Sequence, residues 1–268
     1  MTTVISSVNL KGGVGKTALA VNFAAYCGRK GYRTLLIDLD PQTNATFSCI
    51  TIEDWQAHAK AHGTVAELLG VRNHTSAEGK KVEAADTIIS DVFKNVDLLP
   101  SHLDLFTIDL DIAGKTARET LLRKAMKDVL EEYDIVVCDC PPNLTLPTQN
   151  ALAISTHFVT PVSPDFLSSL GIALLLKRVQ TFGDDIERKI EHAGVVLSRV
   201  GRTSTFREQT MQSLRDAFGD AMFDAEIRER SVVTEATAMN KSVYQMSNRD
   251  AANEFRAFSR ELLGRVGF

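Results

Sequence analysis

The 268-residue sequence lacks long hydrophobic runs, and no basic segment precedes an apolar stretch at its amino end. A membrane-spanning helix needs about 20 consecutive apolar residues, so the sequence predicts neither a membrane span nor a secretory signal. Linkers rich in Pro, Gly or Ser and repeats of fixed period are also missing. We therefore expect a cytosolic protein with a single domain that covers residues 1–268.

An excess of basic charge is missing as well. Lys and Arg number 30 against 34 Asp and Glu, which gives a net charge of −4. A protein that binds nucleic acid over its whole surface needs clustered Lys and Arg. The composition argues against such a protein, whereas it still allows a local basic patch. Residues 1–171 carry 15 basic and 20 acidic side chains, and residues 172–268 carry 15 and 14. The second segment is therefore the less repulsive surface for DNA.

Cysteine is scarce. The four cysteines, Cys27, Cys49, Cys138 and Cys140, form no CxxC pair and have no companion His at zinc spacing. We interpret them as small buried side chains in a reducing compartment.

The sequence does contain short apolar runs that alternate with longer stretches of helical period. This alternation is typical of βαβ units, so we predict an α/β fold with one doubly wound, mostly parallel sheet flanked by helices. The expected strands are 3–8, 33–37, 96–99, 135–138, 158–162, 195–197 and 222–227. The expected helices are 17–30, 118–132, 167–182, 205–218 and 251–266. The polar stretch 72–87 is expected to be a surface excursion.

A glycine-rich loop follows the first expected strand and leads directly into a helix. Residues 9–17 have the sequence Asn-Leu-Lys-Gly-Gly-Val-Gly-Lys-Thr. Such a loop lets backbone N–H groups converge on a phosphate at a helix N-terminus. Lys16 is then expected to reach the β- and γ-phosphates, and the Thr17 hydroxyl to ligate Mg²⁺. The alternative is a glycine-rich turn that binds nothing, which would not require Gly-Lys-Thr at the helix start.

Two other expected strands end in aspartates. Asp38 and Asp40 follow the strand 33–37, and Asp139 follows the strand 135–138. Ligands of α/β sheets bind at the carboxyl ends of the strands. An apolar run that ends in one Asp is typical of a Mg²⁺ site, so Asp139 is the predicted metal residue, and its alternative is a helix-capping aspartate. For Asp38, a role at this ligand-binding edge and simple pairing with nearby backbone or a lysine are equally suited alternatives.

The strict phosphate-loop pattern GxxxxGK[ST] fails because Leu10 stands where its first glycine belongs, and a second lysine, Lys11, precedes the double glycine. Residues 11–17, Lys-Gly-Gly-Val-Gly-Lys-Thr, resemble the deviant Walker A motif of the ParA/MinD family of ATPases. Residues 38–46 resemble the first switch of that family, and residues 139–144 resemble the second. Segments 99–105, 118–130, 149–152, 158–162 and 168–171 resemble the core of ParA in the same order.

The resemblance implies an ATP-dependent sandwich dimer. In it, Lys11 crosses to the nucleotide held by the other subunit, and Asp40 positions the attacking water. A second cation near the phosphates would neutralise charge that develops in phosphoryl transfer. The residues expected to hold ATP or ADP are Lys11, Gly12, Gly13, Val14, Gly15, Lys16 and Thr17, with Mg²⁺ at Thr17 and Asp139. The alternatives are a surface lysine at position 11 and a turn-starting aspartate at position 40.

Family members without an N-terminal helix-turn-helix bind nucleoid DNA non-specifically as ATP dimers, and this sequence enters its first strand at residue 3. We therefore expect no DNA-reading domain before that strand. A ParB-like or small adaptor protein stimulates hydrolysis in such relatives, whose cargo is a plasmid, a chromosome origin, carboxysomes or chemoreceptor clusters. The implied location is the cytoplasm, on the nucleoid. Candidate DNA contacts are Arg199, Arg202, Arg207, Arg228 and Arg230, and each is equally suited to a solvated or paired surface position.

Two other functions share this type of loop. MinD relatives attach to membranes through a C-terminal amphipathic helix, and four apolar residues recur here at helical spacing: Phe255, Phe258, Leu262 and Val266. Glu254 and Glu261 interrupt the basic face, so we favour packing of this stripe on the sheet and do not expect membrane binding. Iron–sulfur carriers need bridging cysteines, and Cys138 and Cys140 do not have that spacing.

Overall fold

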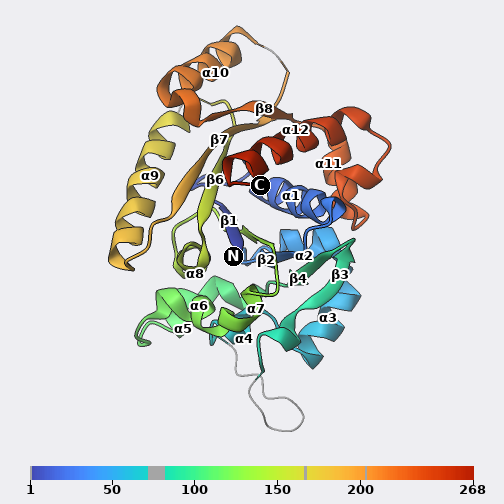
Figure 1. Ribbon diagram of the computed structural model, residues 1–268, viewed down its shortest axis with the longest axis vertical. Coiled ribbons are helices and arrows are strands. Elements are labelled where there is room, and N and C mark those ends of the chain that lie inside the picture. The colour runs from blue at the N-terminus through green and yellow to red at the C-terminus, as the bar shows by residue number, and fades with distance from the viewer. Residues whose placement is uncertain (1, 72–81, 166–167, 203) are drawn as a thin grey trace.

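The computed structural model of the protein describes residues 2–71, 82–165, 168–202 and 204–268 (Figure 1). The strands are β1 (Thr3–Ser7), β2 (Thr34–Asp38), β3 (Ile89–Phe93), β4 (Val96–Leu99), β5 (Ile135–Asp139), β6 (His157–Val162), β7 (Glu191–Val200) and β8 (Met222–Arg228). Within the described residues they form one eight-stranded sheet in the order β3-β4-β2-β5-β1-β6-β7-β8. Only the β3–β4 pair of these neighbours is antiparallel. The predicted α/β fold with a mostly parallel sheet is therefore confirmed.

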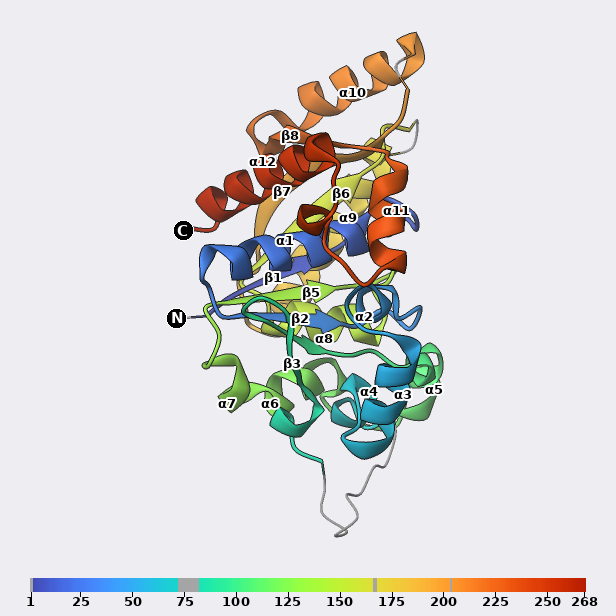
Figure 2. The same cartoon turned by 90° about the vertical axis from the view of Figure 1, so that its right-hand side faces the viewer.

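Helices cover both faces of the sheet. They are α1 (Lys16–Lys30), α2 (Asn44–Cys49), α3 (Ile52–Ala61), α4 (Val65–Leu68), α5 (Ile108–Asp111), α6 (Leu121–Ala125), α7 (Lys127–Leu130), α8 (Leu146–Ile154), α9 (Ser168–Asp185), α10 (Thr205–Phe218), α11 (Ser231–Ala238) and α12 (Arg249–Arg265). Apolar side chains of α1 and α12 pack on one face, and those of α4, α6, α8 and α9 pack on the other. Figure 2 shows α11 next to α2, with which it is in contact.

The strands form where apolar runs can be buried on both faces, as parallel strands require. In β2, Leu36 packs with the α1 side of the sheet, whereas Leu35 and Ile37 pack with the opposite side. This alternation follows from the two-residue period of a strand. It fixes the register of β2, and with it the position of the acidic residues at the end of that strand.

Most predicted elements are confirmed with shifts of a few residues at their ends. The prediction of one helix over 118–132 is wrong, because that segment is divided into a 3₁₀ turn (Arg118–Thr120), α6 and α7. The break lies at Met126, whose backbone (φ −96°, ψ 2°) leaves the helical region. Part of the expected excursion, residues 72–81, and the expected helix start at residue 167 lie outside the described residues.

The apolar stripe near the carboxyl end packs on the body of the protein. Phe255, Phe258 and Leu262 are each only 1% exposed, and Val266 is also buried. The packing interpretation of this stripe is confirmed. Among the helices of the described residues, none combines the length and the apolar character needed to cross a bilayer.

All four cysteines are buried and free, as expected. Burial raises the pKa of each of their thiols, which keeps them in the unreactive protonated form. In the part of the chain that is described, no three His, Cys, Asp or Glu side chains form a group that could hold a metal ion.

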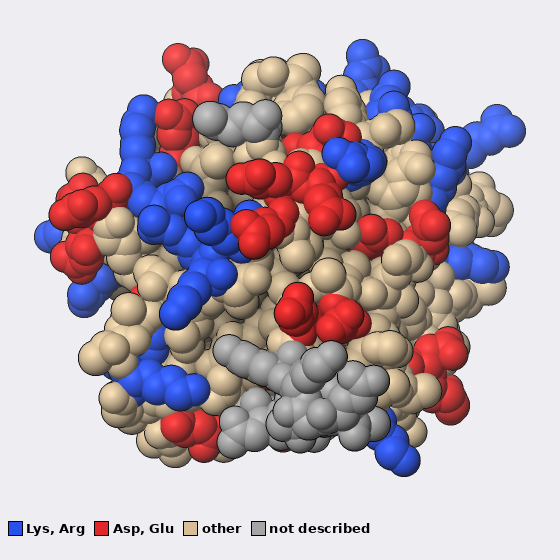
Figure 3. Space-filling view, turned by 60° about the horizontal axis from the view of Figure 1, so that its bottom comes forward, with Lys and Arg blue, Asp and Glu red and all other residues tan. Residues whose placement is uncertain are grey.

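Charges of both signs lie on the face shown in Figure 3. Lys and Arg side chains lie on both sides of that face, most densely at the left, and groups of Asp and Glu lie between and beside them. This mixture agrees with the nearly balanced composition of 30 basic and 34 acidic residues.

Candidate nucleotide-binding site

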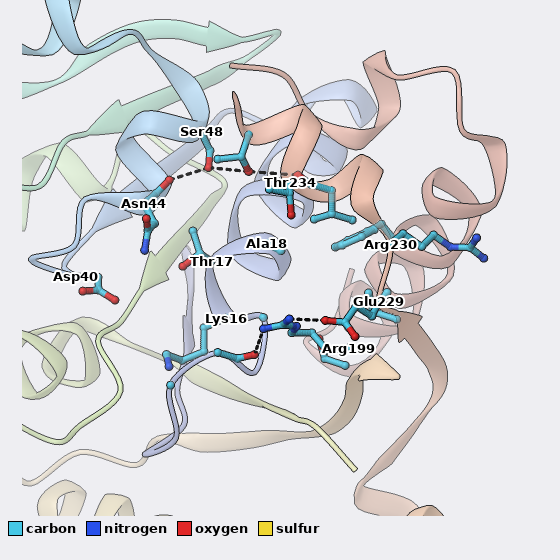
Figure 4. Close-up of a pocket in the computed structure, with 18 of the residues that line it drawn as sticks. Lys16, Thr17, Ala18, Asp40, Asn44, Ser48, Arg199, Glu229, Arg230 and Thr234 are labelled. Carbon is cyan, nitrogen blue, oxygen red and sulfur yellow. Dashed lines mark hydrogen bonds and ion pairs between the residues drawn. The ribbon is translucent and has the colours of Figure 1, made fainter. Parts of the chain in front are cut away.

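The three predicted site segments meet because the strands that carry them are neighbours. β2, β5 and β1 are adjacent in the sheet, and Asp139 is in register with both Ser7 and Asp38. The phosphate loop (residues 9–17), the first switch (38–46) and the second switch (139–144) therefore leave the same edge of the sheet. An open cleft of about 630 Å³ lies there (Figure 4). Most of the predicted nucleotide-binding residues line it: Gly12, Gly13, Gly15, Lys16 and Thr17.

The phosphate loop is fixed at both ends. At its start, Asn9 donates from Nδ2 to the Pro161 carbonyl (2.7 Å) and accepts from the Lys11 amide (2.9 Å). At its end, Gly15 has φ +88° and immediately precedes α1. A Cβ at Gly15 would lie 2.5 Å from Ser198 Oγ, so the loop tolerates only glycine there. The free N–H groups of the first turn of α1 are thus available to a phosphate. Val14 is buried and does not line the cleft.

Lys16 supplies a positive charge inside the loop. It is only 6% exposed, and its Nζ donates to the Lys11 carbonyl at 3.1 Å. Burial lowers the pKa of Lys16, and the Asp139 carboxylate is the strongest influence that opposes this shift. Within the described part of the chain this ammonium is bonded only to backbone, so it is well placed to neutralise a phosphate.

Asp139 has the surroundings expected of a cation ligand. It is fully buried, and neither of its carboxylate oxygens accepts a hydrogen bond from the described residues. Burial, followed by the charge of Asp38, raises the pKa of Asp139 well above its usual range, and the Thr17 hydroxyl acts in the opposite direction. A buried carboxylate that accepts no well-formed hydrogen bond from the described residues is costly unless a cation neutralises it. Asp139 and Thr17, both oxygen ligands, therefore fit Mg²⁺, and these two residues would hold the ion.

Asp40, in the first switch, lies beside the second switch. It lines the main cleft and also a smaller pocket of about 240 Å³ that is bounded by Pro141 and Asn143 of the second switch. Asp40 Oδ1 accepts from the Gln42 amide at 2.9 Å, while its carbonyl accepts from Ser101 Oγ at 2.7 Å. Burial raises the pKa of Asp40, and the Gln42 amide and the Lys16 charge oppose that shift. The other carboxylate oxygen, which accepts no hydrogen bond from the residues that the structure describes, is available to a water or a nucleotide.

Asp38 is a structural neighbour of Asp40. It is fully buried and accepts from the Thr46 amide (2.8 Å), the Thr46 hydroxyl (2.7 Å) and the Asp40 amide (3.1 Å). Burial raises the pKa of Asp38 to about 7. Of the two expectations for Asp38, pairing with nearby backbone is therefore the one that is observed, and this pairing anchors the first switch.

Lys11 lies at the exposed end of the loop. Its Nζ forms an ion pair with Asp165 at 2.6 Å, and 54% of its side chain is exposed. The contact is made within one chain, so the role of Lys11 across a dimer stays a prediction.

The five arginines predicted as DNA contacts fall into two groups. Arg199, Arg228 and Arg230 line the cleft, whereas Arg202 and Arg207 lie outside it. Arg230 is paired with Glu254 at 2.7 Å. Arg207 donates to the Arg202 carbonyl. DNA binding by these residues stays a prediction.

The far wall of the cleft was not predicted from the sequence. It comprises Ser198 and Arg199 at the end of β7, Glu229 after β8, and Val233, Thr234 and Thr237 of α11. Asn240, two residues after the end of α11, joins this wall to α2 because its Nδ2 donates to the carbonyls of Phe47 (2.8 Å) and Ile50 (2.7 Å). The signal that could have identified the wall is its position at the carboxyl ends of β7 and β8, the edge where α/β sheets bind ligands.

The chain is similar to known proteins over most of its length. A family model described as an AAA domain matches residues 2–192. Over 263 residues the chain is 32% identical to the chromosome-partitioning ATPase Soj of Thermus thermophilus. The aligned region covers 98% of this chain and 96% of Soj. The chain is 30% identical over 260 residues to the cell division protein PomZ of Myxococcus xanthus. That alignment covers 97% of this chain and 77% of PomZ.

A solved structure has the same fold. The crystal structure of cobyrinic acid a,c-diamide synthase from Mycobacterium smegmatis with bound ATP analogue and magnesium superposes with a TM-score of 0.79 at 24% identity, and covers 98% of this chain and 94% of that one. The phosphate loop with its second lysine, the two switches and these matches together establish that the chain belongs to the ParA/MinD family of ATPases.

Proposed function

We propose that the protein is a partitioning ATPase that works as a nucleotide switch. ATP with Mg²⁺ binds in the cleft and closes a homodimer, the dimer binds DNA non-specifically, and hydrolysis stimulated by a partner protein releases it. The observation that supports this most is the meeting of three features at one edge of the sheet. They are the phosphate loop with the buried Lys16, the buried carboxylate of Asp139, and Asp40 of the first switch beside the second.

Each residue has a distinct part in the proposed hydrolysis. The phosphate loop and Lys16 bind and orient the β- and γ-phosphates. Asp40 holds the attacking water through its unused carboxylate oxygen. Mg²⁺, held by Thr17 and Asp139, would neutralise charge on the phosphate oxygens. Lys11 of a second subunit adds a positive charge where negative charge develops.

Dimer closure requires that ATP favour the closed state by contacts that the open state lacks. Lys11 supports this step because its present partner is easily replaced. An exposed ion pair such as Lys11–Asp165 contributes about 0–1 kcal/mol. A γ-phosphate beside a second chain offers Lys11 a stronger, charge-assisted contact.

The names of the relatives support a role in positioning cargo. Soj is a chromosome-partitioning ATPase, and PomZ is a cell division protein. For this chain we propose a plasmid, a chromosome origin or a protein assembly such as carboxysomes or chemoreceptor clusters as cargo. A ParB-like or small adaptor protein would stimulate hydrolysis, and the working location would be the cytoplasm, on nucleoid DNA. The MinD-like alternative is not favoured because the apolar stripe of α12 is buried.

Sedimentation with nucleotide tests the switch. The wild-type protein should be a monomer with ADP and shift to a dimer with ATP, whereas Lys11→Ala should stay largely monomeric. Lys60→Ala, which removes an exposed lysine on α3, is the matched control and should behave like wild type. An unchanged dimer fraction in Lys11→Ala counts against the crossing lysine.

The phosphate-loop assignment has a separate test. Lys16→Ala should lose nucleotide binding, and retained ATP affinity would contradict the phosphate-loop assignment.

A further inference from the structure

Arg199 connects the phosphate loop to the opposite wall of the cleft. It is the ninth residue of β7, and its backbone has φ +53°. Its Nη1 donates to the Gly13 carbonyl at 2.8 Å, and its Nη2 is paired with Glu229. Figure 4 shows Arg199 between the phosphate loop and Glu229. The guanidinium is therefore held from two sides.

Much of the hydrogen-bonding capacity of Arg199 is still available. A guanidinium has five N–H donors, and the contacts with Gly13 and Glu229 use two of them. Half of the side chain is exposed, and it lines the same cleft as Lys16 and Thr17. The charge is thus presented beside the loop whose backbone N–H groups are expected to receive phosphate.

Arg230, which also lines the cleft, is differently placed. Arg230 is bonded to Glu254 (2.7 Å) and lies within 3.9 Å of Asp250. In Figure 4 its side chain points away from the phosphate loop. Among the described arginines that line the cleft, Arg199 is therefore the one that is bonded to the loop.

We propose that Arg199 is a nucleotide-binding residue that contacts the polyphosphate of ADP and ATP, and that Glu229 weakens this contact by pairing with Arg199. The proposal rests on the proposed nucleotide site. A planar guanidinium matches phosphate oxygens and forms short, charge-assisted hydrogen bonds with them. Because Gly13 and Glu229 already order the side chain, little conformational freedom is lost when the ligand binds.

Glu229 is fixed in its position opposite Arg199. Its amide donates to the Val200 carbonyl at 3.0 Å, which ties the segment after β8 to the end of β7. Its carboxylate neutralises part of the charge that a phosphate would meet. Removing that negative charge should therefore strengthen binding of an anion, whereas it would weaken binding if Glu229 served only to brace Arg199.

Equilibrium binding of fluorescent ADP and ATP tests the proposal. Arg199→Ala should raise the Kd for both nucleotides about tenfold, while kcat at saturating ATP stays within about twofold, because the contact is the same in the ground and transition states. Arg199→Lys should lose less nucleotide affinity than Arg199→Ala, because lysine keeps the positive charge. Arg178→Ala, which removes an exposed arginine on α9 outside the cleft, is the control and should match wild type. An unchanged Kd in Arg199→Ala, or a loss confined to DNA retention, would overturn the assignment.

Glu229→Gln separates direct contact from bracing. We expect it to lower the Kd for ADP and ATP several-fold, and we expect this gain to vanish in the Arg199→Ala background. A higher Kd, or a gain that persists without Arg199, would refute the proposed pairing effect. Thermal unfolding without nucleotide shows whether each variant is folded, and Arg199→Lys and Glu229→Gln keep the test open if Arg199→Ala is not. If wild type binds no nucleotide, the proposed function fails; if Lys16→Ala loses binding and Arg199→Ala does not, only this inference fails.

Discussion

Asp40 and Asp38 are two residues apart, yet their surroundings give them different roles. Asp38 has all its contacts inside the protein, whereas Asp40 faces the cleft. We expect Asp40→Ala to reduce ATP hydrolysis by about 100-fold or more, the usual effect of losing a group that positions and activates water. Nucleotide affinity should change little, because Lys16 and the phosphate loop remain. Phosphate release at saturating ATP, measured together with nucleotide Kd, checks both; hydrolysis at the wild-type rate would show that Asp40 does not position the water.

His192 makes stability depend on pH. It stacks on Phe158, with ring centroids 4.7 Å apart, and burial lowers its pKa to about 4, with a smaller contribution from Arg265. Between pH 4 and the ordinary value of about 6.5, the unfolded chain binds a proton that the folded chain does not, so the free energy of unfolding falls as pH is lowered. His157 shifts in the same direction.

The decrease in the free energy of unfolding that is attributable to His192 reaches about 3 kcal/mol at the lower end of this pH window. Because glutamine cannot titrate, the free energy of unfolding of His192→Gln should depend less on pH. Urea unfolding of both proteins at pH 4.5, 5.5 and 7 measures it, and equal slopes in the two proteins would contradict the prediction.

At the scale of elements, α12 is held by aromatic packing. Phe258 is 1% exposed, and its ring centroid lies 6.3 Å from that of Phe23 and 5.4 Å from that of Phe223. Phe258→Ala should lower the free energy of unfolding by about 3–5 kcal/mol, measured by urea denaturation. Phe206→Ala, on an exposed position of α10, is the control and should change it by about 0.5 kcal/mol or less. A stable Phe258→Ala protein that has lost binding to anionic vesicles would instead favour the membrane alternative.

Elements with a long or strong pattern were predictable, and short ones were not. β5 and α10 follow from an apolar run and a capped amphipathic stretch. β3 was missed because two of its five residues are exposed and Asp91 has φ +55°, so that neither alternation nor an apolar run is present. α4 and α5 have four residues each, which is too short for a helical period to emerge. α8 is apolar on nearly all sides and therefore shows no periodic face.

The candidate site shows the same division. Lys16, Asp40 and Asp139 lie in local motifs, and their place at one sheet edge follows from the parallel topology. Arg199 and Glu229 reach the same cleft from segments without a motif that lie more than 180 residues after the phosphate loop. Charge alone suggested a DNA contact for Arg199, because its bond to Gly13 depends on how β7 lies beside the phosphate loop.

At the scale of the whole molecule, the charge distribution bears on DNA binding. With ATP, we expect DNA retention that weakens steeply as salt concentration rises, because each phosphate contact releases counterions. The double variant Arg202→Ala/Arg207→Ala should weaken retention and make the salt slope shallower by about one for each phosphate contact removed. Titrating labelled duplex DNA at several salt concentrations, with ATP and with ADP, measures both. Retention that ignores salt would exclude a phosphate-contact mechanism.

The sheet order also has a consequence for biosynthesis. β1, which carries the phosphate loop, pairs with β5 and β6, whose residues lie at 135–139 and 157–162. A growing chain therefore exposes its phosphate loop first but cannot seat that loop in the sheet until about half of its length has been made. Pairings between such distant segments are slow because a long loop must be closed before any contact is gained. A ribosome-bound fragment that ends before residue 135 lacks both neighbours of β1, so ATP retention by a nascent chain would report that the central strands have assembled.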